Sequence, residues 1–80
     1  MQTVELSAKA LKQLRSLPLV DRDVLLNKLQ TFAQTGRGDV KKLKGSHFFR
    51  LRHGDWRAVF DRKDNVLFVL DIAHRRDIYK

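Results

Sequence analysis

The chain has 80 residues and carries 17 Lys and Arg against 9 Asp and Glu, a formal net charge of +8 at pH 7. This length and an apolar content of 42% predict a single folded domain over residues 1–80. The absence of cysteine excludes disulfide bridges and thiolate metal sites. The longest uncharged apolar run, residues 66–70, is too short to cross a membrane, and the N-terminus lacks the pattern of a signal peptide. We therefore expect a cytoplasmic protein with no membrane partner.

The first half of the chain has the pattern of a short strand followed by two helices. Apolar and polar residues alternate over residues 3–6, as in a half-buried strand. Ser7 is a suitable helix N-cap, and the following apolar residues recur at three- and four-residue spacing, which predicts a helix over residues 8–16. Pro18 separates this helix from a second one over residues 19–34. A helical hairpin is therefore expected after the first strand.

The second half of the chain begins with a connector and continues with a β-hairpin. Residues 35–46 contain three glycines and three lysines and are predicted to form a surface connector. Gly54-Asp55 then matches a two-residue type II′ turn, which has glycine first. The register that this turn imposes puts Arg50, Arg52 and Arg57 on one face of the sheet, pointing away from the core. The opposite, core-facing side chains are Phe49, Leu51, Trp56, Ala58 and Phe60.

A last strand is expected over residues 66–73, after a turn around residues 63–65. If that turn holds three residues, Asp71 lies opposite Arg57 on the basic face. The core-facing residues of this strand are then Phe68, Leu70 and Ile72. The predicted fold is therefore α+β, in the order β-α-α-β-β-β, with the helical hairpin packed on one face of a small antiparallel sheet.

Basic residues concentrate in the second half of the chain. Residues 37–80 hold twelve basic and six acidic side chains, whereas residues 1–36 hold five and three. Arginine is suited to binding RNA because its planar guanidinium can donate two hydrogen bonds to one phosphate. A basic surface of this kind attracts polyanions if its groups converge. The alternative is a solvated basic face that keeps a small protein soluble.

Other chemical signals in the sequence are weak. His47, His53 and His74 are scattered and have no paired carboxylates at metal-ligand spacing, so no metal or other cofactor is expected. No serine lies in a nucleophile elbow, and no Gly-rich phosphate loop is present. What remains is the set of sheet-face arginines with residues 74–76 and Tyr79. Such groups can cleave RNA without a metal, by moving protons and by stabilising the charge of the transition state.

Four short segments carry a resemblance to a known family. They are residues 42–45 (KLKG), 49–52 (FRLR), 54–60 (GDWRAVF) and 73–79 (AHRRDIY). In this order and spacing they resemble the RelE/ParE superfamily of toxins, in particular the RelE branch, and the resemblance covers essentially the whole chain. It implies the toxin of a type II toxin–antitoxin pair, with a cognate antitoxin as partner. In the RelE branch, it implies a ribosome-dependent endoribonuclease that cleaves mRNA and leaves a 2′,3′-cyclic phosphate.

The resemblance also implies roles for individual residues. Arg57 falls on the phosphate-holding arginine of the RelE branch, and Tyr79 falls on its terminal tyrosine. The full set of implied catalytic residues is Arg50, Arg52, Arg57, His74, Arg75 and Tyr79. The residues expected to bind RNA and the ribosome are Lys41, Lys42, Lys44 and Arg76.

The sequence departs from the RelE branch at the proton acceptor. Where that branch can use a lysine, this chain has arginine, which is not deprotonated in proteins. His74 or His53 would then have to act as the base. Two alternatives remain: a ParE-like inhibitor of DNA gyrase, a branch that generally lacks the arginine–tyrosine constellation, and a catalytically inactive toxin homologue that binds antitoxin.

Overall fold

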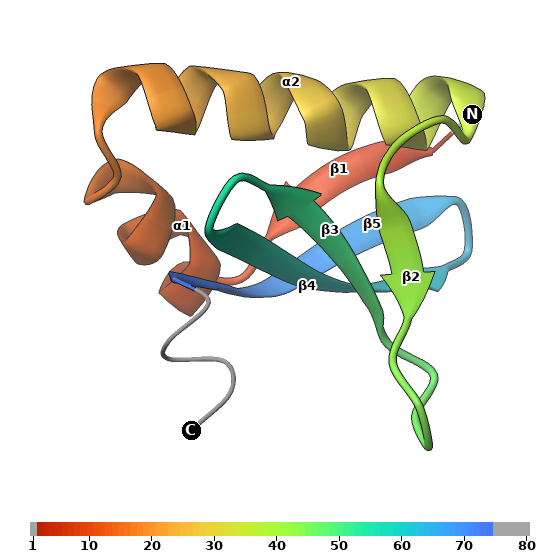
Figure 1. Ribbon diagram of the computed structural model, residues 1–80. Coiled ribbons are helices and arrows are strands. Elements are labelled where there is room, and N and C mark those ends of the chain that lie inside the picture. Colours follow the sequence, from red (N-terminus) through yellow and green to blue (C-terminus); the bar gives the residue numbers. More distant parts are fainter. Residues whose placement is uncertain (1, 75–80) are drawn as a thin grey trace.

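The computed structural model describes residues 2–74 (Figure 1). The helices and strands of this part of the chain are β1 (Thr3–Leu6), α1 (Ala8–Arg15), α2 (Leu19–Thr35), β2 (Val40–Lys42), β3 (Phe49–His53), β4 (Trp56–Lys63) and β5 (Val66–His74). The strands form one sheet in the order β1-β5-β4-β3-β2, and α2 lies along one face of it. The predicted α+β class and the helical hairpin are confirmed.

Both helices begin and end at residues whose chemistry favours a boundary. The Ser7 hydroxyl accepts a hydrogen bond from the backbone N–H of Ala10 at 3.0 Å and donates one to the Leu70 carbonyl at 3.1 Å. The N-cap of α1 therefore also attaches this helix to β5. α2 follows Pro18 directly and ends at Gly36, whose φ of 75° is the left-handed conformation that glycine adopts at low cost.

The hairpin of β3 and β4 has the predicted register. Leu51 pairs with Ala58, and Arg52 pairs with Arg57. Gly54 has a φ of 55°, as the first position of a type II′ turn requires. We call the side of the sheet that carries Leu51, Ala58 and Phe60 the helix face, and the side that carries the arginines the outer face.

The hairpin of β4 and β5 differs from the prediction at its turn. Asp64 and Asn65 both have positive φ, 53° and 63°, as in a two-residue type I′ turn, and Lys63 pairs directly with Val66. The turn is therefore one residue shorter than predicted. As a result the alternation along the start of β5 is reversed, and Phe68 lies on the outer face, 36% exposed.

A β-bulge then changes the register again. Phe60 pairs with Val69, whereas Val59 pairs with Asp71, so Leu70 is an extra residue in β5. The prediction that Phe68 and Leu70 face the core is wrong, because Leu67 and Val69 take these places; the prediction for Ile72 is confirmed. For the same reason Asp71 lies opposite Val59, and not opposite Arg57 as predicted.

The two edges of the sheet also correct the prediction. β1 pairs with β5 in parallel, from Thr3 opposite Val66 to Leu6 opposite Val69, so the sheet is mixed and not antiparallel. The alternation of residues within a strand carries no information on the direction of so distant a partner. At the other edge, β2 lies within the predicted connector and pairs with β3. Only Val40 in this strand is apolar, which is too little pattern for a strand to be predicted.

The core lies between the two helices and the helix face of the sheet. Its buried residues are Ala10, Leu14, Leu17, Leu25, Leu29, Phe32, Ala33, Leu51, Ala58, Phe60, Leu67, Val69 and Ile72. None of the helices within residues 2–74 is long and apolar enough to cross a membrane. Because the helices cover one side of the sheet only, polar side chains on the outer face are available to a ligand.

Candidate nucleic-acid interface

Basic side chains from three strands meet on the outer face. Lys41 of β2 pairs with Arg50 of β3, and Arg52 of β3 pairs with Arg57 of β4. Directly paired residues project from the same side of a sheet. The shared face predicted for the three arginines is therefore confirmed, and Lys41 joins it through the strand that was not predicted.

Arg57 differs from the other cations because it is buried. Only 6% of this residue is exposed, although it lies on the outer face. One terminal nitrogen, Nη1, donates to the carbonyls of Gly54 at 2.8 Å and Trp56 at 3.0 Å. The Nε–H of Arg57 is buried and has no hydrogen-bond partner in the part of the chain that the structure describes. A buried charged donor without an acceptor is costly, and this cost favours a movement of the Arg57 side chain that brings Nε to an acceptor such as an anion.

Arg52 lies at the same turn as Arg57. Its Nε donates to the Gly54 carbonyl at 3.3 Å, which is the oxygen that also accepts from Arg57. Two guanidinium groups therefore meet at one carbonyl of the β3–β4 turn. Because arginine is always charged, this end of the outer face is permanently cationic.

The two histidines proposed as bases do not lie on the outer face. His53 pairs with Trp56, on the helix face. Its Nε2 contacts Asp21 Oδ1 at 3.0 Å and its Nδ1 contacts Lys28 Nζ at 3.3 Å, so both ring nitrogens are occupied by α2. His74 also pairs with Trp56, and the two rings meet edge to face at 5.3 Å. The structure thus places both histidines on the face opposite to the arginines with which the sequence grouped His74.

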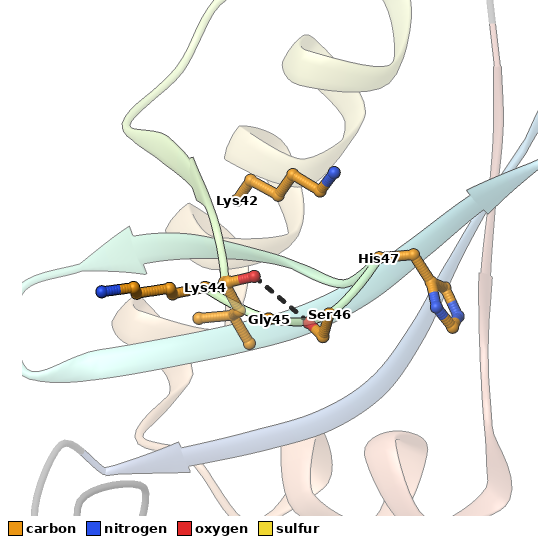
Figure 2. Close-up of a pocket in the computed structure, with 6 residues that line it drawn as sticks. Lys42, Lys44, Gly45, Ser46 and His47 are labelled. Carbon is orange, nitrogen blue, oxygen red and sulfur yellow. Dashed lines mark hydrogen bonds between the residues drawn. The ribbon is translucent and has the colours of Figure 1, made fainter.

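Lys41 and Lys42, which follow each other in β2, belong to opposite faces of the sheet. Lys42 pairs with Phe49 and so belongs to the helix face, unlike Lys41. Figure 2 shows Lys42 and Lys44 extending in different directions from a depression of about 570 Å³. The connection is shaped by Ser46, whose hydroxyl donates to the Leu43 carbonyl at 3.3 Å. Lys42 therefore does not share the outer face with Lys41, and the roles expected for Lys41, Lys42 and Lys44 in binding RNA stay predictions.

Arg75, Arg76 and Tyr79 lie outside the described residues, so their predicted roles stay predictions.

A polar network that the sequence did not predict links α1 to the end of β5. Gln13 donates from Nε2 to Asp71 Oδ1 at 2.8 Å, and its Oε1 accepts from the backbone N–H of Ile72 at 2.7 Å. Lys9 Nζ lies 3.5 Å from the same Asp71 oxygen. Lys9 and Gln13 have the spacing of residues on one side of a helix, but nothing in the sequence relates them to Asp71.

Comparison with solved structures shows which class of protein has this fold. The chain is 26% identical to RelE in the crystal structure of the intact E. coli RelBE toxin–antitoxin complex, over 92% of this chain and 96% of that one, with a TM-score of 0.77. It is equally identical, 26%, to the archaeal RelE–RelB complex from Pyrococcus horikoshii OT3, over 92% and 94%, with a TM-score of 0.76. The isolated E. coli RelE toxin, 24% identical over 92% and 84%, has a TM-score of 0.81. The fold is that of RelE-like toxins.

The family follows from the sequence match. A family model described as the ParE toxin of the type II toxin–antitoxin system, parDE, matches residues 4–79. The chain belongs to this family of toxins, within the RelE/ParE superfamily, and its similarity to RelE structures agrees with the RelE branch. No curated protein matches the chain.

Proposed function

We propose that the chain is a ribosome-dependent mRNA endoribonuclease that inhibits translation. The observation that supports this most directly is the buried Arg57, whose Nε–H has no acceptor among the described residues. Phosphodiester oxygens are suitable acceptors for such a group. Arg50 and Arg52 on the same face add positive charge around it. We infer the ribosome and its mRNA as partners from the resemblance to the RelE branch.

The reaction is transfer of the phosphoryl group within the RNA. The 2′-oxygen attacks the adjacent phosphorus, the bond from phosphorus to the 5′ oxygen breaks, and the products are a 2′,3′-cyclic phosphate and a 5′-hydroxyl. Arg57 donates to the phosphate oxygens and, with Arg50 and Arg52, stabilises the charge that develops on them. One group must take the proton of the 2′-hydroxyl, and another must protonate the leaving oxygen.

His74 is the better of the two histidines for the proton acceptor. The His74 side chain is 32% exposed and that of His53 is 19% exposed. Both nitrogens of His53 are occupied by α2. His74 Nε2 lies 4.0 Å from Asp55 Oδ2, and His74 follows Ala73, the residue paired with Arg57. His74 is therefore next in the chain to the arginine end of the outer face, although its own position in β5 belongs to the helix face. Arg75 and Tyr79 complete the proposal as the second cation and the terminal tyrosine.

The proposed function also implies an antitoxin as partner and the cytoplasm as the location of the protein. The solved RelE relatives form complexes with an antitoxin, and we assign this chain a cognate antitoxin that inhibits it. Lys41, Lys42, Lys44 and Arg76 are assigned to ribosomal RNA. The whole chain acts as one domain in the cytoplasm.

Expression without an antitoxin tests this proposal. Induction is expected to arrest growth and to produce new RNA ends inside translated codons, mapped by primer extension on a reporter mRNA. Arg57→Ala is expected to remove both effects. Arg22→Ala, on α2, is a matched control that removes the same charge and should retain both. Growth arrest by Arg57→Ala would contradict the assignment of the active site.

The alternative, inhibition of DNA gyrase, is favoured by one observation: the matching family model is that of ParE toxins. In that case DNA supercoiling would stop before translation, and the reporter mRNA would stay intact. A folded protein that causes no arrest would instead indicate an inactive homologue that binds antitoxin.

A further inference from the structure

A depression of about 520 Å³ lies where α1 meets the end of β5. Its wall includes an aromatic side, Trp56 and His74, and a polar side, Lys9, Gln13 and Asp71. Flat rings next to polar groups are the usual surroundings of an unstacked nucleobase, which is held by stacking and recognised through hydrogen bonds at its edge.

Asp71 is held in one orientation at this depression. Turning the Gln13 amide over would exchange Nε2 and Oε1 and so lose both the bond to Asp71 Oδ1 and the bond from the Ile72 N–H. Oδ1 also receives the contact from Lys9. Oδ2 accepts no hydrogen bond and forms no ion pair within residues 2–74, and the side chain is 34% exposed. The depression therefore offers a fixed carboxylate edge beside an ammonium group.

We propose that this depression binds guanine. The Watson–Crick edge of guanine has two adjacent donors, N1–H and the N2 amino group, and one acceptor, O6. The donors match the carboxylate of Asp71, and O6 matches the ammonium of Lys9. Adenine, cytosine and uracil each place an acceptor beside their donor on that edge, and an acceptor facing a carboxylate is repelled. The chemistry of the site thus selects guanine from the four bases.

The depression adjoins the arginine end of the outer face. Ala73, which lines it, pairs with Arg57 across the sheet, and Trp56, which also lines it, accepts a hydrogen bond from Arg57 through its carbonyl. A nucleotide can therefore place its phosphate at Arg57 and its base in the depression. This assignment rests on the proposed function, for which it names a determinant of sequence preference.

Trp56 allows a direct test because it is the only tryptophan of the chain. Purified full-length protein is titrated with GMP, AMP, CMP and UMP at constant ionic strength, and Trp56 fluorescence is recorded. The phosphate is common to all four probes, so differences report the base. We expect GMP to bind at least about tenfold more tightly than the other three nucleotides. Equal binding of the four nucleotides would overturn the proposal.

Asp71→Asn separates recognition from folding. The new amide keeps its oxygen toward Gln13 and presents its NH₂ where Oδ2 was, so it faces the donors of guanine with another donor. GMP binding is expected to weaken at least about tenfold, to the level of AMP. Asp23→Asn, an exposed carboxylate on α2, is the matched control and should keep the preference for GMP. A preference for GMP that survives Asp71→Asn would also overturn the proposal.

The map of RNA ends distinguishes this inference from the proposed function. If the wild-type chain cleaves next to guanine, and Asp71→Asn still cleaves but without that bias, both the ribonuclease activity and the guanine site are supported. Ends whose bias does not change in Asp71→Asn would overturn the guanine site and leave the ribonuclease. Selective GMP binding without any ends would overturn the ribonuclease and leave the guanine site.

Discussion

Phe60 and Arg57 are both buried in β4, but they lie on opposite faces of the sheet and are buried in different ways. Phe60 is fully buried on the helix face, with the rings of Phe32 and Phe49 each 5.6 Å away. It has no polar side-chain atom that needs a partner. Arg57 is buried on the outer face, and its Nε–H lacks an acceptor among residues 2–74. The packing of the helix face therefore leaves Phe60 with no unmet need, whereas Arg57 on the outer face keeps a donor that is satisfied only if its side chain moves to an acceptor.

Phe60→Ala is expected to have the largest effect, and it acts on folding. Removing a fully buried phenylalanine costs about 3–5 kcal/mol, which is most of the stability of so small a protein. We expect the variant to be largely unfolded in circular dichroism and to lack a cooperative urea transition. A variant that melts cooperatively near the wild-type temperature would show that the helix face tolerates a cavity at its centre.

Arg57→Ala is expected to have the next largest effect, and it separates folding from function. The variant loses two hydrogen bonds to backbone carbonyls but also removes the unpaired Nε–H, so we expect a stability loss of about 1–2 kcal/mol. Urea unfolding of Arg57→Ala and Phe60→Ala under the same conditions compares the two losses of stability. Cleavage should be absent while the protein stays folded. A stability loss as large as that of Phe60→Ala would mean that the main role of Arg57 is to stabilise the folded state.

The two β-hairpins show how far the sequence predicts this fold. Gly54-Asp55 has glycine first and matches one turn type, so the register of β3 with β4 was predicted correctly. Lys63, Asp64 and Asn65 do not distinguish a two-residue turn from a three-residue turn, and Asn and Asp both tolerate positive φ. The bulge at Leu70 depends on how β5 meets β4 and α1, which no local pattern encodes.

The sequence predicted those parts of the candidate site that depend on the alternation of side chains between the two faces of a strand. The common face of Arg50 and Arg52 follows directly from the register. The burial of Arg57 was not predicted, because it depends on how its side chain folds back to the turn carbonyls. The network of Gln13 and Asp71 joins elements at opposite ends of the chain and needs the packed fold.

The exposed cations of the outer face are expected to contribute to binding and not to stability. Lys41 and Arg52 are both exposed, so the double change Lys41→Gln and Arg52→Gln should leave urea unfolding unchanged. It should weaken RNA binding and lower the slope of log K against log salt by about 0.7 for each phosphate that is no longer neutralised. Titrations of a fluorescent RNA at several salt concentrations measure this slope. Lys63→Gln, at the far end of β4, is the control and should retain the wild-type slope.

The smallest effect expected is that of His53→Ala, which tests which of the two helix-face histidines takes part in cleavage. His53 links the β3–β4 turn to Asp21 and Lys28 of α2, so its removal should cost about 1 kcal/mol. Cleavage should persist, because its ring faces α2. His74→Ala should instead remove cleavage, with a stability loss of about 1 kcal/mol because its ring meets Trp56 edge to face. Urea unfolding and mapping of RNA ends for the two variants side by side measure both effects. Loss of cleavage in His53→Ala alone would identify His53, and not His74, as the base.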